Sequence, residues 1–290
     1  MRLSPMTVFL GLALAVVTAG SAEAEPDLSR EGFRVGPSDL IDTVSRICLT
    51  PLESDLEILE WESRAAWIEQ FLAHKLAHAG FETVPSARVA EARAAAEREA
   101  GGIYDTLTGR AMPAKRAGVE SAQRAALARL GCKAVLHAEI HLVRLRWETG
   151  VASWDYVRHS MGGGELYLGT ADGLSLWLAL RTLDGTELLV RAGGIEPLWK
   201  LEGGGFWSDP EWQDAHPQAL LQTPHLNARA VIAALGALAE PAAPEIVACV
   251  DAAAKTTRKL DRVAQRAACE VERFTFVAPP KKSPEEAVAE

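Results

Sequence analysis

The feature that most constrains the fold of this chain is an alternating stretch that runs into a tight turn. Every second residue from position 174 to 180 is leucine, and the residues between are Ser175, Trp177 and Ala179. A period of two is typical of a strand with one face in the core. Asp184-Gly185 follows as a strong hairpin signal, and we expect 187–199 to return as the partner strand. This chain must therefore build a β-sheet.

The rest of the chain alternates expected strands with expected helices. Strands are predicted over 44–52, 81–85 and 134–146, and helices over 63–79, 87–100, 117–130 and 227–240. The stretch 245–273 contains neither Gly nor Pro and fits one long helix. Early strand–helix–strand order implies parallel pairing with right-handed crossovers. We predict an α/β fold: a single mixed β-sheet with early βαβ units and a later β-hairpin, helices packed on the sheet, and a long C-terminal helix.

The N-terminus has the pattern of an export signal. Arg2 precedes an apolar run over 8–19, which has the length of a signal-peptide core and is too short to span a membrane. Ala22-Glu23-Ala24 matches the small-x-small pattern of a cleavage site, so we expect residues 1–24 to be removed. No cysteine precedes Cys48, which argues against a lipid anchor. We expect an exported mature chain, periplasmic or extracellular, with no integral membrane span after cleavage.

Composition sets the remaining organisation. The chain is 48% apolar and 24% charged, which is ordinary for a globular protein. We predict a lead-in segment over 25–40, an α/β domain over 41–240, a C-terminal helix over 241–277 and a disordered tail over 278–290. The formal net charge is -9 and the basic residues form no cluster in the linear sequence, so we predict no nucleic-acid partner.

The four cysteines can pair in an oxidising compartment. Cys249 and Cys269 lie 20 residues apart, and one continuous helix would separate their Cα atoms by about 30 Å. Because a disulfide needs Cα atoms within about 7 Å, we predict that these two are not bridged. Cys48 and Cys132 belong to strands expected to be neighbours, where buried free thiols are the commoner state. The sequence leaves three full pairings open.

Three short motifs follow one another along the expected α/β domain. They are RICLTPL at 46–52, LGCKAVL at 130–136 and LRTLDGTEL at 180–188. Together they resemble the α/β domains of the TolB N-terminal domain, the curli secretion channel protein and related accessory lipoproteins. Three further segments, 102–109, 153–155 and 191–195, resemble uncharacterised secreted bacterial proteins. The first resemblance implies an envelope domain of α/β type, and the second brings no known activity.

Two groups of histidines are candidate metal ligands. His137, Glu139 and His141 share one face of an expected strand, but neighbours on that face are about 7 Å apart, which is wide for one ion. His74 and His78 are four apart on an expected helix, with no third ligand in sight. We interpret both groups as surface or boundary side chains, and we predict neither a metal ion nor a cofactor.

Tryptophan-containing loops are the strongest candidate for a function. The loops expected over 148–173 and 202–218 hold the candidate binding residues Trp154, Asp155, Trp207, Asp209 and Trp212. Exposed aromatic side chains beside acids are typical of protein interfaces and of surfaces that stack sugars. The alternative is a purely structural role, in which the tryptophans cover the open ends of the sheet.

The sequence contains no G-x-S-x-G motif, and the glycine triplets at 162–164 and 203–205 lack the lysine of a phosphate loop. We therefore expect no catalytic residues and a non-enzymatic exported envelope protein. It would bind a protein partner, or assemble with itself, through the Trp-rich loops. The alternative is a periplasmic hydrolase or carbohydrate-binding protein that uses the same loops.

Overall fold

The computed structural model describes residues 32–104, 110–148, 151–160, 168–202, 211–214, 220–239, 244–256 and 262–278. The expected signal peptide and its cleavage site lie outside these residues, as do both glycine triplets and the tail from residue 279. Within the described part of the chain, no helix combines the length and the apolar character that crossing a membrane requires.

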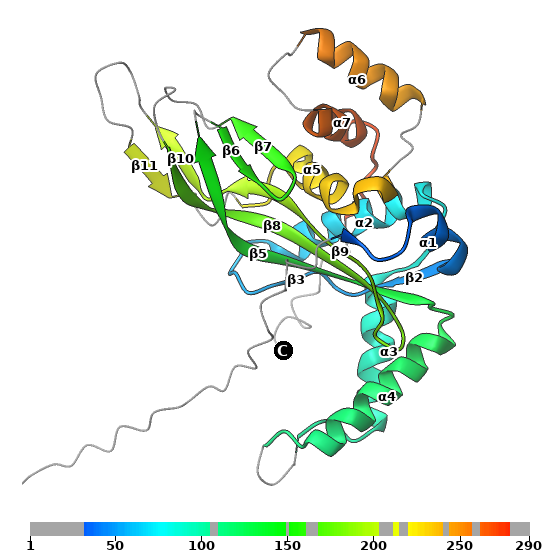
Figure 1. The fold of residues 1–290 in the computed structure, drawn as a ribbon. Helices are drawn as coiled ribbons and strands as arrows, with labels where there is room; N and C mark the ends of the chain where they lie inside the picture. The colour runs from blue at the N-terminus through cyan, green and yellow to red at the C-terminus, as the bar shows by residue number, and fades with distance from the viewer. Residues whose placement is uncertain are drawn as a thin grey trace, which may run out of the picture.

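A nine-stranded mixed sheet forms the centre of the fold, with strand order β1-β9-β8-β5-β2-β4 (Figure 1). Its strands are β1 (Gly32–Phe33), β2 (Arg46–Leu49), β3 (Glu53–Ser54), β4 (Glu82–Val84), β5 (Ala134–Glu148), β6 (Val151–Trp154), β7 (Val157–Ser160), β8 (Leu168–Thr182) and β9 (Glu187–Pro197). A separate antiparallel pair consists of β10 (Trp199–Glu202) and β11 (Glu211–Asp214).

The helices are α1 (Pro37–Thr43), α2 (Trp61–His78), α3 (Ser86–Glu99), α4 (Pro113–Arg129), α5 (Pro224–Leu235), α6 (Pro244–Thr256) and α7 (Arg262–Val271). A short 3-10 helix, η3 (Gly236–Ala239), continues α5. In Figure 1, α2 and α5 cover one face of the sheet and α6 and α7 lie beyond them. The pair α3–α4 projects from the other side, at one end of the sheet.

The predicted fold class is confirmed. β2 pairs in parallel with both β4 and β5, as the early βαβ units require. β8 and β9 form the expected antiparallel hairpin around Asp184-Gly185. β5 and β8 are each 15 residues long and pair along their whole length, from Ala134 opposite Thr182 to Glu148 opposite Leu168. This long ribbon runs from the α3–α4 end of the sheet to the β6–β7 hairpin.

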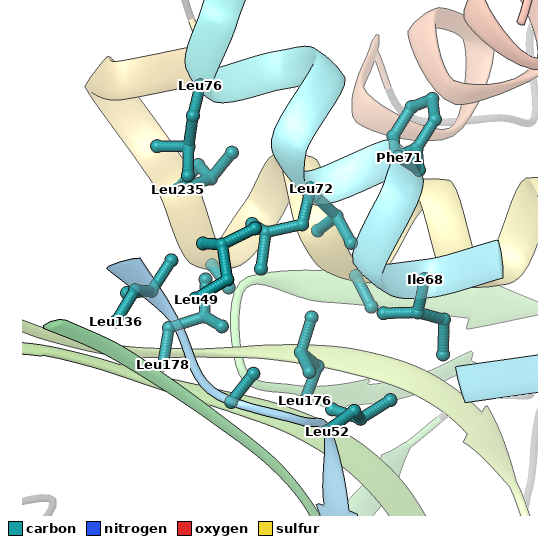
Figure 2. Close-up of a cluster of buried hydrophobic side chains, with 14 of the residues drawn as sticks. Leu49, Leu52, Ile68, Phe71, Leu72, Leu76, Leu136, Leu176, Leu178 and Leu235 are labelled. Carbon is teal, nitrogen blue, oxygen red and sulfur yellow. The ribbon is translucent and has the colours of Figure 1, made fainter. Parts of the chain in front are cut away.

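Alternation along the strands divides the apolar side chains between two layers. The main core lies between the sheet and the helices α2 and α5, and Figure 2 shows Leu49, Leu136 and Leu178 of the strands facing Leu72 and Leu76 of α2. A smaller cluster lies under α3 and α4, on the opposite side of β2 and β5. It consists of Cys48, Val84, Val89, Leu127, Cys132 and Val135.

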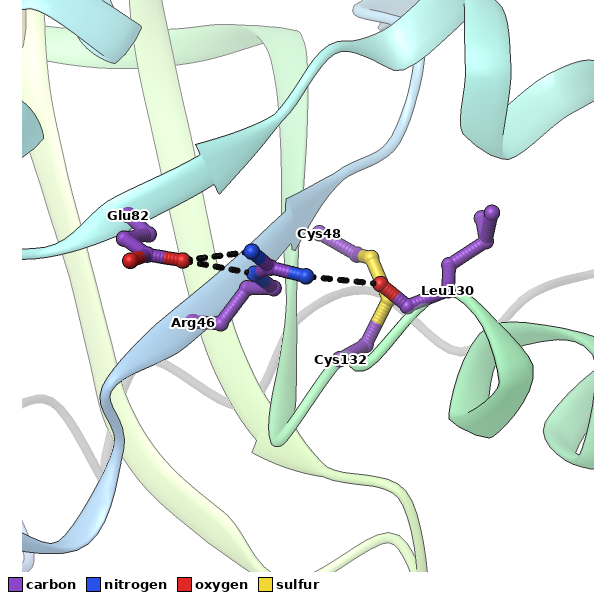
Figure 3. Close-up of a disulfide and its surroundings, with 5 residues drawn as sticks. All are labelled: Arg46, Cys48, Glu82, Leu130 and Cys132. Atoms are coloured by element: carbon purple, nitrogen blue, oxygen red, sulfur yellow. Dashed lines mark hydrogen bonds and ion pairs between the residues drawn. A yellow bond between two sulfur atoms is a disulfide. The ribbon is translucent and has the colours of Figure 1, made fainter.

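Cys48 and Cys132 are bridged, which corrects the expectation of free thiols (Figure 3). Cys48 is opposite Val135 in the parallel pair β2–β5, and Cys132 lies just before β5, so the two Cα atoms are 5.6 Å apart. Beside the disulfide, Arg46 donates from Nε to Glu82 at 2.8 Å and from a guanidinium nitrogen to the Leu130 carbonyl at 3.3 Å. The start of β5 is therefore fixed to β2 covalently and by charged hydrogen bonds.

The prediction of one continuous C-terminal helix is wrong, and so is the prediction that Cys249 and Cys269 are not bridged. The segment forms two helices, α6 and α7, and the disulfide joins them with a Cα–Cα distance of 6.0 Å. That distance is incompatible with the roughly 30 Å that a single helix would impose. The helix breaks although the sequence between α6 and α7 holds neither Gly nor Pro.

Two details add to the expected elements. Part of the lead-in segment packs on the fold: β1 adds to the edge of the sheet beside β9, and Leu40 of α1 is fully buried. Asn227, where the helix over 227–240 was expected to begin, lies inside α5, where it is buried and donates to the Leu221 carbonyl at 2.9 Å. The helix begins earlier, with Pro224 in its first turn, a position that suits proline because no backbone donor is needed there.

Candidate functional site

The first expected loop, over 148–173, is largely a hairpin. β6 pairs with the end of β5, and β7 pairs with β6. Trp154 is opposite Val157, which leaves Asp155 and Tyr156 as a two-residue turn. Both turn residues have positive φ, 39° and 62°, as in a type I′ turn. Asn and Gly are the usual residues there, so a Tyr in this conformation holds local strain.

Trp154 is a core residue, which corrects the expectation of an exposed loop side chain. It is only 8% exposed and packs with Leu145, Ala152 and Val157. Its indole Nε1 donates to the Leu174 carbonyl at 3.1 Å. A buried indole with its donor satisfied stabilises the fold and offers nothing to a partner.

The turn is anchored by its other contacts with the sheet. The Ser175 hydroxyl donates to the Asp155 carboxylate, and the Gly194 amide donates to the Asp155 carbonyl at 3.1 Å. A Cβ on Gly194 would collide with Trp154, so this glycine lets the hairpin approach β9. The 191–195 motif, singled out in the sequence, therefore serves close packing.

Tyr156 is the aromatic side chain that the turn exposes. It is 56% exposed, and the Arg191 guanidinium carbon lies 4.2 Å from the centre of its ring, within the range of a cation–π contact. Arg191 also donates to the Ala233 carbonyl of α5 at 3.2 Å. The ring is thus presented outward on a rigid turn, with a guanidinium held against it.

The sequence analysis expected Trp154 to be exposed, whereas the exposed aromatic side chain of this turn is Tyr156, two positions later. It identified Trp154 and Asp155 and passed over Tyr156, although the pairing of two short strands around Asp155-Tyr156 predicts which residues form the turn. Trp212 lies in β11, opposite Leu201 of β10. Trp207 and Asp209 lie outside the described residues. The structure therefore brings Asp155 together with Tyr156 and Arg191.

The histidine groups do not converge on a metal site. His141 Nε2 lies 3.1 Å from Glu139 Oε2, but His137 belongs to a separate cleft under α3 and α4. His74 and His78 are exposed neighbours on α2 with ring centres 4.4 Å apart. Burial, followed by the charges of His78 and Lys75, lowers the pKa of His74. No group of three metal-ligating side chains occurs among the residues that the structure describes.

That separate cleft has a volume of about 240 Å³. Its lining comes from α3, α4, β5 and the β8–β9 turn: Arg93, Glu120, Gln123, Arg124, Leu127, Val135, His137 and residues 181–185. Burial first, and then the charges of Arg93 and Arg181, together lower the pKa of His137 to about 4. The imidazole is consequently neutral at neutral pH.

The segment around this cleft is more basic than the chain as a whole. The segment 86–133 carries nine basic and five acidic residues in a chain whose net charge is -9. The net charge of the whole chain conceals this local excess of basic residues.

A buried ionic cluster was also missed. Lys75 Nζ lies 2.9 Å from Glu270, and Arg266 Nε donates to the same carboxylate at 2.7 Å. All three side chains are 10% exposed or less. The cluster joins α2 to α7 inside the fold, so we assign it a structural role.

Comparison with known proteins adds no family. No protein-family model matches the chain, and no curated protein is significantly similar to it. The resemblance to the TolB N-terminal and curli accessory domains therefore stays a prediction.

Proposed function

We propose that this chain is an exported, non-enzymatic envelope protein that binds a protein partner, or a second copy of itself, through the β6–β7 turn. The observation that carries the proposal is Tyr156, an exposed ring in left-handed backbone with Arg191 stacked on it. Tyr and Arg are the residue types enriched at the energetic centres of protein interfaces. Strain kept at an exposed aromatic position is a further mark of function.

The disulfides support export. All four cysteines of the chain are paired. Disulfides of this structural kind persist in secreted and periplasmic proteins and are rare in reducing compartments. They agree with the expected signal peptide, and sequencing the N-terminus of the exported chain tests that part directly, with Glu25 as the expected first residue.

Crosslinking in the native host tests the binding surface. A photoreactive amino acid at position 156 is expected to give a discrete crosslinked species. The same amino acid at Tyr104, which is also 56% exposed, serves as the matched control and is expected to give none. Equal crosslinking at both positions, or none at 156, would contradict the proposal.

The substitution Tyr156→Asn then separates binding from folding. Asn tolerates left-handed backbone, so the turn is kept while the ring is lost. We expect the captured partner to disappear while thermal stability is maintained. Loss of a soluble oligosaccharide ligand in place of a protein would instead favour the alternative, a carbohydrate-binding protein.

A further inference from the structure

The cleft under α3 and α4 combines an apolar floor with a basic rim. Leu127 of α4 and Val135 of β5 are nearly fully buried and form part of its floor. Arg93, Arg124 and Arg181 come from α3, α4 and β8 and line the same space. Three separate elements thus place guanidinium groups around one small apolar surface.

The acidic side chains that line the cleft already accept hydrogen bonds from neighbouring residues. Glu120 accepts a hydrogen bond from Arg116 at 3.2 Å within α4. Asp184 accepts hydrogen bonds from the Thr182 hydroxyl and, at 3.1 Å, from the Thr186 amide within the β8–β9 turn. These bonds hold the carboxylates in local turn and helix contacts.

The arginines, by contrast, are weakly paired. Among the described residues, the Arg181 guanidinium pairs with Glu187 alone, at 3.6 Å. Arg93 and Arg124 make no side-chain hydrogen bond or ion pair with any residue in the described part of the chain. His137, on the same wall, is kept neutral, and part of the cause is the positive charge of Arg93 and Arg181. A surplus of positive charge therefore faces the cleft.

These features define the chemistry of a ligand. Arginine forks bind the oxygens of phosphate in bidentate fashion, and a neutral imidazole can add one more hydrogen bond. The volume of about 240 Å³ suits a small molecule rather than an extended polymer. The apolar floor requires the ligand to carry a short apolar stem beside its charged group.

We propose that this cleft binds a phosphate monoester, with its phosphate among Arg93, Arg124 and Arg181 and its apolar stem on Leu127 and Val135. The site lies at the opposite end of the β5–β8 ribbon from Tyr156 and does not depend on the function proposed for that turn. The ester is either a soluble metabolite-sized molecule or the headgroup of a lipid phosphomonoester.

Calorimetric titration with phenyl phosphate tests the proposal on the full mature chain. We expect saturable binding that is tighter than binding of inorganic phosphate, because only the ester reaches the apolar floor. The double variant R93Q/R124Q should weaken it by about tenfold or more, since two charged hydrogen-bonding partners are lost. The variant R98Q/R110Q removes the same charge outside the cleft, from the end of α3 and from the segment just before α4, and should bind normally.

Two further readouts fix the place and the source of the ligand. Bound phosphate should raise the pKa of His137, followed by NMR of its ring protons, because a nearby dianion favours the imidazolium. Sedimentation with vesicles then compares phosphatidic acid, a monoester, with phosphatidylglycerol, a diester. Binding to phosphatidic acid alone identifies a lipid headgroup, and binding to phenyl phosphate without either vesicle identifies a soluble ester.

The proposal is overturned if phenyl phosphate shows no saturable binding, or if R98Q/R110Q weakens binding as much as R93Q/R124Q does. It is also overturned if the pKa of His137 stays unchanged at saturation. Melting curves accompany each variant. Should R93Q/R124Q fail to fold, the exposed single variant R124Q replaces it, with the same expected direction and R98Q as its control.

Discussion

The two ends of the β5–β8 ribbon are closed in different ways. At the α3–α4 end, a disulfide joins Cys48 of β2 to Cys132 just before β5, and Arg46 of β2 donates hydrogen bonds to Glu82 of β4 and to the Leu130 carbonyl (Figure 3). At the other end the β6–β7 hairpin is held without a covalent bond, by hydrogen bonds and by Trp154, which is buried against β8 and close to Gly194. Because a disulfide closes the α3–α4 end, the arginines near it remain available to a ligand. At the β6–β7 end, the large aromatic side chain of Trp154 is buried to hold the hairpin and is not available.

The largest effect is expected from removing the covalent closure. The variant C48A/C132A opens a disulfide whose cysteines are 84 residues apart, and the loop-entropy model gives a loss of about 4 to 5 kcal/mol in the free energy of unfolding. C249A/C269A is the matched control: its separation is 20 residues, for which the same model gives about 3 kcal/mol. Urea unfolding of both variants measures the difference, and a reversed order would contradict this comparison.

Truncating the aromatic side chain at the packed end should have the next largest effect. Trp154→Ala leaves a cavity beside Leu145 and the Leu174 carbonyl without its donor. We expect a loss of about 3 to 4 kcal/mol, measured by thermal or urea unfolding. Trp154→Phe fills most of the cavity and should lose clearly less. An unchanged melting temperature for Trp154→Ala would show that the indole is a surface contact after all.

A pH effect is expected at the cleft end. The pKa of His137 in the folded chain is lowered to about 4 from its ordinary value of 6.5, so protonation favours the unfolded chain. Above pH 6.5 the neutral imidazole contributes fully to the free energy of unfolding. This contribution is lost as the pH falls towards 4, by roughly 2 kcal/mol at pH 4.5.

This effect is measured as a difference between variants. Arg93, Arg181, Glu120 and Asp184 line the same cleft and titrate or carry charge in both proteins, so the comparison of wild type with His137→Gln removes their common contribution. The unfolding free energy of wild type minus that of His137→Gln should fall as the pH is lowered from 7 to 4.5. A difference that stays constant with pH would show that the pKa of His137 is not lowered in the folded chain.

The smallest effect is expected at the turn. Tyr156→Asn relieves left-handed strain of about 1 kcal/mol and loses a cation–π contact of about 0.5 kcal/mol. The net result is a gain of about 0.5 kcal/mol in the free energy of unfolding, resolved by urea titration against wild type. A clear loss would mean that the stacked pair of Tyr156 and Arg191 stabilises the fold more than the strain opposes it.

The elements were largely predictable, but their contacts were not. Periodicity and the Asp184-Gly185 turn placed β8, β9 and most helices, because those signals are local. The burial of Trp154 depends on the register between β6 and β5, which no local pattern fixes. The break between α6 and α7 carries no Gly or Pro signal, so the bridge from Cys249 to Cys269 was excluded on a false premise.

The two candidate sites, the β6–β7 turn and the cleft under α3 and α4, likewise depend on contacts between elements. Tyr156 lies in the turn between β6 and β7, within a segment that was expected to be a loop, so its place became evident only once these strands were paired. The cleft is assembled from α3, α4, β5 and the β8–β9 turn, segments whose proximity is decided by the sheet order rather than by any motif.

The ionic cluster of Lys75 and Glu270 has a consequence for how the chain matures. The two residues are 195 positions apart, and the ribosome releases α2 long before it makes α7. A nascent chain that closed its core early would bury the Lys75 ammonium without a counter-ion, at a cost of several kcal/mol. A chain cut before α7 therefore lacks the counter-ion of Lys75, and we expect proteases to cleave its α2 region more readily.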